Sequence, residues 1–252
     1  MRPLPKWISE IICRSGLQYM PVRVRHGLPK GASWTLYPWT SYWRARYEPW
    51  ISDAILSLGD LTGKSCWDLG AHFGYYSIGL ARKVGPTGSV AAFEPFPSSF
   101  ARLERHRQMN GLSWMKALPF AASDEKRQAD FFSDTSQGDT GVHLAYDGET
   151  KTANTLLIQI QTKRLDDLVD RNEIKPPDLI KIDVEGHGHR ALSGAHNCIR
   201  NKRPVIVMGF HSDHEVEGTL SLLKPLGYRW TALQSDPQGK FVGCDYLLQA
   251  TA

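Results

Sequence analysis

The stretch SCWDLGAHFGYYSIGLARKVG, residues 65–85, decides the fold. Its first part, SCWDLG, is a short apolar run that ends at Gly70, as a buried β-strand does where a turn begins. From Tyr75 onwards the residues have helical periodicity, and Gly85 is suited to end a helix at its C-terminus. A strand followed directly by a helix is the first half of a βαβ unit.

The same alternation continues after this stretch. Strands are predicted in SVAAFE (89–94), MKALPFAAS (115–123, interrupted by Pro119), DLIKIDVEG (178–186) and PVIVMGFH (204–211), and helices over 98–111, 189–201 and 215–227. Two final strands, 228–234 and 241–250, flank a predicted hairpin turn. The predicted fold class is therefore α/β: a doubly wound, Rossmann-like sheet, mostly parallel, with an antiparallel C-terminal hairpin strand.

Two regions fall outside this alternation. Residues 1–58 are predicted to form an N-terminal extension or cap, irregular at first and helical over 41–58 with a break near Pro49. Residues 59–252 are predicted to form the main domain. Within it, the polar segment 133–154 is predicted to be a long loop that acts as a lid over bound substrate.

Positive charge and tryptophan are concentrated in the N-terminal extension. The net charge is +4, yet the first 50 residues alone contain eight Lys or Arg against two Glu, together with five of the eight tryptophans. No run approaches the roughly 20 apolar residues of a membrane span, and the N-terminus lacks the features of a signal peptide, so a cytoplasmic protein is expected. The four scattered cysteines argue against a structural zinc site and a disulfide framework.

The turn after the first strand, residues 68–74, contains the first candidate binding residues. Gly70 suits a tight turn, Gly74 lets a ligand approach the start of the helix, and Asp68 offers a carboxylate to an ammonium group. Glu94 follows about 20 residues later, where nucleotide-binding domains place an acid for ribose hydroxyls.

The spacing of these glycines bears on the choice of cofactor. It differs from the G-x-G-x-x-G of dinucleotide sites, and Asp68 would repel a pyrophosphate, so S-adenosylmethionine fits better than NAD. A purely structural turn and an exposed loop acid are the alternatives for the glycines and for Glu94.

Over residues 47–233 the sequence resembles the FkbM family of methyltransferases. The segments that carry the resemblance are RYEPW (46–50), CWDLGAHFGYYSIGLA (66–81), VAAFEPFP (90–97), TKRLDDLV (162–169) and LIKIDVEGHGHRALSGA (179–195). The resemblance implies S-adenosylmethionine as cofactor and O-methylation of a hydroxyl on a sugar, glycan or secondary metabolite. The residues expected to bind the cofactor are Asp68, Gly70, Ala71, Gly74, Tyr75, Glu94, Ser123, Asp124 and Asp183.

Two positions depart from the family pattern. An acid is usual two residues after the glycine of the IKIDVEG block and again near the end of the fifth strand, where this sequence has Gly188 and Gly209. Both changes remove a carboxylate from the expected site. They argue against a metal-assisted mechanism and indicate unusual substrate choice or weak activity.

Charged residues cluster at the end of the predicted strand 178–186. Alternation places Lys181, Asp183 and Glu185 on one face, where charges are costly unless they are paired or used. We predict that Asp183 contacts the acceptor hydroxyl as a base or an orienting group and that Lys181 keeps it ionised. Glu185 is predicted to hold the loop or the substrate. A structural ion-pair network is the alternative.

Three histidines follow these acids. His211 ends the next strand and is the fourth candidate catalytic residue, as a general base with a pKa near neutrality; a packed, hydrogen-bonded histidine is an equal alternative. His187 and His189 are expected to be exposed. Asp183, Glu185, His211 and Asp213 offer ligand atoms for a divalent cation, but no metal is predicted, because acids cluster at strand ends for many reasons.

Three functions compete. The first is O-methylation of a small-molecule or glycan hydroxyl. The second is ribose 2′-O-methylation of RNA, prompted by the basic, tryptophan-rich extension, although a net charge of +4 is modest and nucleic acid is not an expected partner. The third is an inactive cofactor-binding homologue, prompted by Gly188 and Gly209. The acceptor and the oligomeric state are not predicted.

Overall fold

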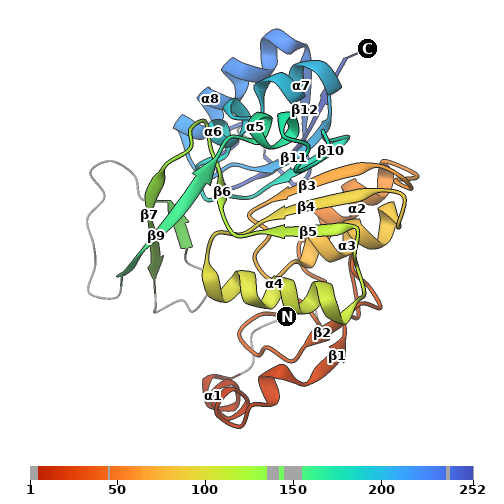
Figure 1. Ribbon diagram of the computed structural model, residues 1–252, viewed down its shortest axis with the longest axis vertical. Helices are drawn as coiled ribbons and strands as arrows, with labels where there is room; N and C mark the ends of the chain where they lie inside the picture. Colours follow the sequence, from red (N-terminus) through yellow and green to blue (C-terminus); the bar gives the residue numbers. More distant parts are fainter. Residues whose placement is uncertain (1–4, 45, 135–141, 145–154, 237–238, 252) are drawn as a thin grey trace.

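A seven-stranded sheet forms the centre of the computed structural model, which describes residues 5–44, 46–134, 142–144, 155–236 and 239–251 (Figure 1). In spatial order the strands are β12 (Tyr228–Ala232), β13 (Asp245–Ala250), β11 (Val205–Gly209), β10 (Leu179–Ile182), β3 (Ser65–Leu69), β4 (Ser89–Phe93) and β5 (Met115–Leu118). The pairings among β11, β10, β3, β4 and β5 are parallel, and β13 is antiparallel to both of its neighbours. The predicted fold class is confirmed.

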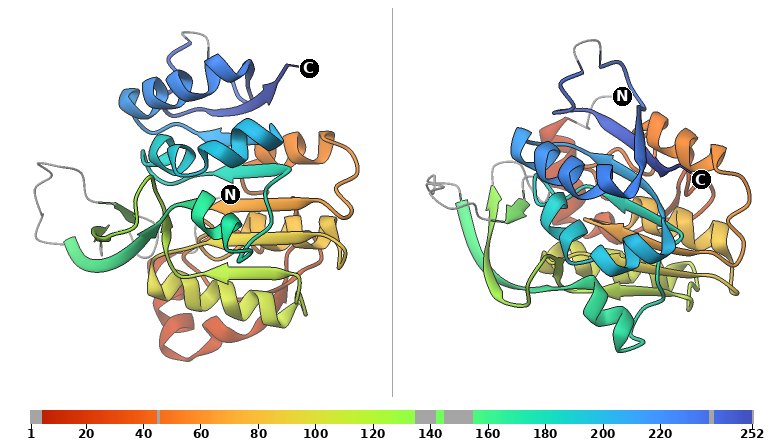
Figure 2. Two further views of the ribbon diagram at one scale, coloured as in Figure 1. Left: turned by 45° about the horizontal axis from the view of Figure 1, so that its top comes forward. Right: turned by 90° about the horizontal axis from the view of Figure 1, so that it is seen from above.

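Helices cover both faces of this sheet (Figure 2). One face packs against α2 (Pro49–Ser57), α3 (Tyr75–Val84) and α4 (Pro97–Met109), and the other against α5 (Leu165–Asp170), α6 (Gly188–Ser193), α7 (His196–Lys202) and α8 (Asp213–Leu223). Successive residues of a strand point to opposite faces of the sheet. Cys66 therefore packs in the hydrophobic core beneath α2, α3 and α4, and Trp67 packs in the core beneath α5 to α8. Burial on both faces explains why the strands are apolar throughout.

The N-terminal extension packs on the α4 side of the sheet. It contains α1 (Lys6–Arg14), the 3₁₀ helix η1 (Leu17–Tyr19) and a hairpin of β1 (Pro21–Arg23) and β2 (Ser33–Thr35). Trp34 is fully buried and stacks on His106 of α4, with ring centroids 3.7 Å apart. The division of the chain at residue 58 stays a prediction.

A second sheet projects from one side of the molecule (Figures 1 and 2). Its strands are β6 (Ala121–Ala122), β9 (Thr155–Lys163), β7 (Gln128–Asp134) and β8 (Val142–Leu144). Outside this sheet, a second 3₁₀ helix, η3 (Lys224–Leu226), connects α8 to β12. Except for the end of β7 and for β8, the predicted lid over 133–154 lies outside the described residues. No helix of the described chain has the length and apolar character needed to cross a membrane.

Three predicted elements begin elsewhere or are divided. The helix predicted over 41–58 begins only at Pro49. Proline is tolerated in the first turn of a helix, because the amide at that position has no intrahelical hydrogen-bond partner. The strand predicted over 115–123 divides at Pro119 into β5 and β6, which belong to different sheets. The helix predicted over 189–201 is two short helices, α6 and α7, separated at Gly194 and Ala195.

The strand predicted over 178–186 is also shorter than expected. It ends at Ile182, although the Asp183 amide still donates to the Leu69 carbonyl at 3.0 Å. Glu185 and Gly186 then take positive φ angles of 50° and 91° and turn the chain toward α6. Asp183 and Glu185 therefore lie on a turn beyond the strand, and simple alternation does not fix where their side chains point.

Candidate active site

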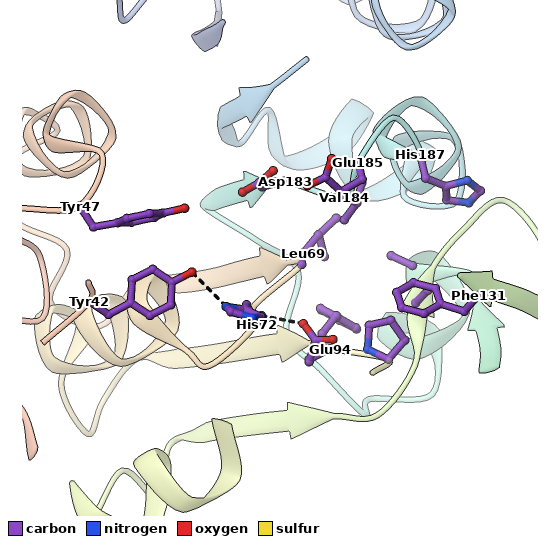
Figure 3. A pocket seen from close by; sticks show the side chains of 15 residues that line it. Tyr42, Tyr47, Leu69, His72, Glu94, Phe131, Asp183, Val184, Glu185 and His187 are labelled. Atoms are coloured by element: carbon purple, nitrogen blue, oxygen red, sulfur yellow. Dashed lines mark hydrogen bonds between the residues drawn. The ribbon is translucent and has the colours of Figure 1, made fainter. Parts of the chain in front are cut away.

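A cavity lies at the carboxyl ends of β3, β4 and β10, where the strand order reverses (Figure 3). Its walls come from the turns after these strands, from β6 and β7, and from the N-terminal extension. The lining residues are Tyr42, Tyr47, Leu69, Gly70, His72, Phe93, Glu94, Pro95, Ala121, Ala122, Phe131, Asp183, Val184, Glu185 and His187. Of the predicted site residues, Gly70, Glu94, Asp183 and Glu185 line this cavity.

Gly70 and Gly74 shape the turn after β3 for different reasons. Gly70 has φ +79°, and a Cβ there would lie 1.8 Å from the carbonyl oxygen of Asp183, so a side chain would push apart the ends of β3 and β10. Gly74 has φ +89°, and its Cβ would meet Leu103 of α4 at 2.6 Å. Gly74 therefore lets α3 pack on α4, and neither it nor Ala71 or Tyr75 lines the cavity.

Glu94 presents a buried carboxylate to the cavity (Figure 3). Its Oε2 accepts a hydrogen bond from the His72 amide at 2.7 Å, and its Oε1 accepts one from the Phe96 amide at 2.8 Å. Burial raises the pKa of Glu94 to about 7, against the effect of these two hydrogen bonds. Each carboxylate oxygen has a further lone pair with which it can accept a hydroxyl of a ligand.

Asp68 lies beneath the cavity and faces the protein interior. It is 0% exposed, and its Oδ1 is 3.7 Å from Nζ of Lys181, its register partner on β10. Ser77 donates a hydrogen bond to its other oxygen. The cation beside Asp68 is therefore Lys181, and the sequence prediction that Asp68 meets a ligand ammonium directly is not met by this geometry.

Lys181 joins the buried acid to the edge of the cavity. Its Nζ is 3.4 Å from Oδ2 of Asp183, and its side chain is 3% exposed. Burial lowers the pKa of Lys181, but the charges of Asp183 and Asp68 outweigh that effect and raise it overall. Burial raises the pKa of Asp183, but the Lys181 charge and a hydrogen bond from His211 hold it below its usual range. Asp183 is ionised at neutral pH.

His211 bridges two carboxylates. Its Nε2 is 3.0 Å from Asp183 Oδ1, and its Nδ1 is 3.3 Å from Glu185 Oε2. Burial lowers the pKa of His211, but the hydrogen bond and charge of Asp183, with Glu185, outweigh it and raise the pKa to about 9. The expectation of a near-neutral pKa is wrong, and His211 is cationic at neutral pH.

These three side chains also offer the ligand atoms of a metal site. One ligand atom each from Asp183, Glu185 and His211 lies within 4.8 Å of the others, and Asp213 is not part of this group. The sequence prediction that no metal binds is not tested by this geometry and stays a prediction.

His187 and Ser123 form a buried pair beside the cavity. His187 is 7% exposed and lines the cavity, contrary to the predicted exposure, and its Nε2 is 3.0 Å from Ser123 Oγ. Burial lowers the pKa of His187 to about 4, so its ring is neutral. Ser123 in turn donates to Asp124, which pairs with Arg190 at 3.7 Å. Ser123 and Asp124 do not line the cavity and reach it through His187.

Sequence reasoning placed aromatic residues of the N-terminal segment beside the acceptor cleft but did not identify which residues line the cavity. Tyr42, Tyr47 and His72 line it, and Tyr42 Oη lies 3.0 Å from His72 Nδ1 (Figure 3). The two tyrosine rings meet edge to face with centroids 4.6 Å apart. The density of aromatic residues before residue 50 was the available signal, but no periodicity in that segment indicated which rings would face the cavity.

Acids from elsewhere in the chain occupy the space beside Gly188 and Gly209. A Cβ at Gly188 would lie 2.7 Å from Oε1 of Glu215, and a Cβ at Gly209 would lie 2.8 Å from Oδ1 of Asp245. Trp50 Nε1 holds the other Asp245 oxygen with a hydrogen bond of 2.7 Å. Both positions thus keep a carboxylate nearby, although the residue itself is glycine.

Residues 68–230 match the profile of the family described as Methyltransferase FkbM domain. One curated relative is the Hexuronic acid methyltransferase AglP of Haloferax volcanii, 29% identical over 142 residues, which cover 56% of this chain and 54% of that protein. Another is the 2-O-methyltransferase NoeI of Sinorhizobium fredii, 26% identical over 151 residues, which cover 56% of this chain and 60% of that protein.

The chain spans little more than half the length of these curated relatives. Among solved structures, a putative rRNA-methylase from Clostridium thermocellum superposes with a TM-score of 0.51 at 12% identity, covering 83% of this chain and 98% of that one. At this identity the likeness concerns the fold.

Proposed function

The chain belongs to the FkbM methyltransferase family, and we propose that it is an S-adenosylmethionine-dependent O-methyltransferase acting on a hydroxyl of a sugar, glycan or secondary metabolite. The observation that carries the proposal is the Glu94 carboxylate. It sits at the end of β4 beside the strand-order reversal, is held by two backbone amides, and faces the cavity. That is the position and chemistry expected for an acid that receives two ribose hydroxyls.

The residues that line the cavity around Glu94 fit a nucleoside with a cationic tail. Phe93, Ala121 and Phe131 offer apolar walls to an adenine ring, and Glu94 accepts from the ribose. Asp183, ionised at the opposite wall, offers negative charge to the cationic end. Asp68, Ser123 and Asp124 are proposed as positioning residues, because they reach the cavity through Lys181 and His187.

The residues after β10 and β11 can hold the acceptor and its proton. S-adenosylmethionine, when bound, supplies an electrophilic methyl group. Asp183 orients the acceptor hydroxyl by accepting its hydrogen bond, and Lys181 keeps Asp183 ionised. His211 is protonated at neutral pH. It can therefore accept the proton of the hydroxyl only in its neutral form, which becomes populated as the pH approaches its pKa of about 9. Glu185 holds His211 from the other side.

The acceptor class rests on the relatives and on the aromatic wall. The names of the two relatives specify a hexuronic acid and a 2-O position, and both are consistent with a sugar hydroxyl. Tyr42 and Tyr47 offer ring faces and hydroxyls suited to a sugar ring, which makes residues 1–58 a proposed contributor to acceptor binding. A cytoplasmic location, the absence of a metal and the exclusion of nucleic acid remain predictions.

Calorimetry tests the cofactor. S-adenosylhomocysteine should bind the native protein, and Glu94→Ala should weaken binding by roughly 1–3 kcal/mol, the range for lost hydrogen bonds to a charged group. Glu217→Ala, an exposed glutamate on α8, is the matched control and should bind as the native protein does. Equal affinity in a folded Glu94→Ala protein would remove Glu94 from the site.

A labelled-methyl assay then tests the chemistry. With a panel of neutral sugars, uronic acids and RNA as acceptors, the native protein should transfer methyl groups to a sugar. Asp183→Asn, measured at saturating cofactor, should lose about 100-fold in turnover, as expected for a positioning or proton-accepting group. Cofactor binding without transfer to any acceptor would favour the inactive homologue, and transfer to RNA would favour the second alternative.

A further inference from the structure

The outer face of α1 is apolar and uncovered. Trp7 and Ile11, one helical turn apart, are 65% and 56% exposed. Ser9, on the inner side of the same helix, is fully buried, and Ile8 and Ile12 are half-buried. The helix therefore packs with one face and presents large apolar side chains on the other.

The next element of the chain also exposes large apolar side chains. Leu17 and Tyr19 of η1 and the following Met20 are 45%, 47% and 45% exposed. We call Trp7, Ile11, Leu17, Tyr19 and Met20 the N-terminal patch. Trp39, Leu56 and Val242 are the other strongly exposed large apolar residues of the described chain, and they are scattered, whereas the N-terminal patch falls within 14 residues. Such a concentration marks an interaction surface.

Arginines border the N-terminal patch. Arg14 is exposed and lies one turn after Ile11 on the same side of α1. On α4, the Arg105 guanidinium lies 5.3 Å from the Tyr19 ring centroid, and Arg23 is exposed shortly after Met20. Glu10 is the one acid of residues 5–30, a stretch with five Lys or Arg. The surface thus combines an apolar centre with a positive border.

We propose that the N-terminal patch docks the protein on an anionic lipid bilayer. Trp7, Ile11 and Leu17 would enter the boundary between headgroups and acyl chains, and the bordering arginines would pair with lipid phosphates. At nine residues α1 is about 13 Å long and lies in the membrane plane without spanning it. It forms the outermost element at one end of the described molecule (Figure 1).

Two other occupants fit this surface less well. RNA would be held by stacking on aromatic rings, but three of the five patch residues are aliphatic or thioether side chains. A second copy of the chain would bring its own arginines against this positive border, and like charges oppose that contact. The proposal does not depend on methyltransferase activity.

Vesicle flotation tests the proposal with the full chain. Vesicles of phosphatidylcholine containing phosphatidylglycerol should carry the native protein upward, pure phosphatidylcholine vesicles should carry much less, and high salt should release it. Replacing Trp7 and Ile11 together by serine should reduce binding to the anionic vesicles by about tenfold or more, because both apolar anchors are lost. Leu56→Ser, at an exposed apolar residue of α2 with 43% exposure, is the matched control and should float as the native protein does.

The controls separate docking from misfolding and self-association. Unchanged thermal unfolding and S-adenosylhomocysteine affinity would show that the double variant is folded. Native protein that stays at the bottom with anionic vesicles, or a double variant that floats equally well, would overturn the proposal. So would a concentration-dependent dimer in sedimentation that the double variant abolishes, since the patch would then be covered by a second copy.

Discussion

The floor and the rim of the cavity are built in different ways. The floor consists of Gly70, Glu94 and Asp183 at the ends of neighbouring parallel strands, and backbone hydrogen bonds fix each position. The rim consists of Tyr42 and Tyr47, which precede α2, and it is extended by Trp50 at the start of α2, which does not itself line the cavity. All three are held by contacts between side chains. Strand pairing therefore determines the floor, whereas individual contacts determine the rim. Substitutions in the two regions should differ in the same way.

Removing the cation beneath the floor should have the largest effect. Lys181→Met leaves the buried Asp68 carboxylate without its ion-pair partner and removes a charge that lowers the pKa of both Asp68 and Asp183. Breaking a buried pair in this way typically costs roughly 3–5 kcal/mol of unfolding free energy. Denaturant unfolding measures the loss.

The double variant Lys181→Met/Asp68→Asn is the control for this prediction. It removes both buried charges, so it should recover part of the stability lost in the single variant. If Lys181→Met unfolds at the native midpoint, the floor does not depend on the buried ion pair, and its contrast with the rim disappears.

A substitution at the rim should cost less. Trp50→Phe keeps a ring but removes the N–H that donates to Asp245 at 2.7 Å. Hydrogen bonds to charged groups are worth roughly 1.5–3 kcal/mol, and the lower end applies here because Trp50 and Asp245 are only partly buried. Thermal unfolding compares this variant with Trp39→Phe, at an exposed tryptophan that does not line the cavity. A larger loss than that of Lys181→Met would reverse the contrast.

The smallest effect is expected for pH, because the His211 side chain is 31% exposed and solvent screens its charge interactions. His211 has a folded-state pKa of about 9, above the ordinary value of about 6.5, because Asp183 and Glu185 stabilise its charge. Its contribution to stability is fully present below pH 6.5 and is lost as the pH rises through 9. The difference in unfolding free energy between native protein and His211→Gln should therefore shrink over that interval. A difference that grows with pH would mean that His211 is neutral in the folded state.

From the sequence, a residue of the floor could be placed at the cavity only where the order of strands along the chain is enough to locate it. Glu94 follows a strand beside the central one, so its place at the cavity could be predicted. Asp68 lies inside β3, and the pairing of β3 with β10 puts Lys181 opposite it. That register depends on the tertiary structure and could not be predicted from the sequence. Tyr42 could not be predicted, because residues 41–44 and 46–48 form no regular element whose periodicity would orient its ring.

The place of β13 inside the sheet has a consequence for the handling of this protein. β13 lies between β11 and β12, and it is the strand nearest the C-terminus of the chain. Loss of β13 would thus remove an interior strand and leave β11 with an open row of amide and carbonyl groups, while β12 would lose its partner. Open strand edges template pairing between molecules, so a preparation that lacks β13 would aggregate.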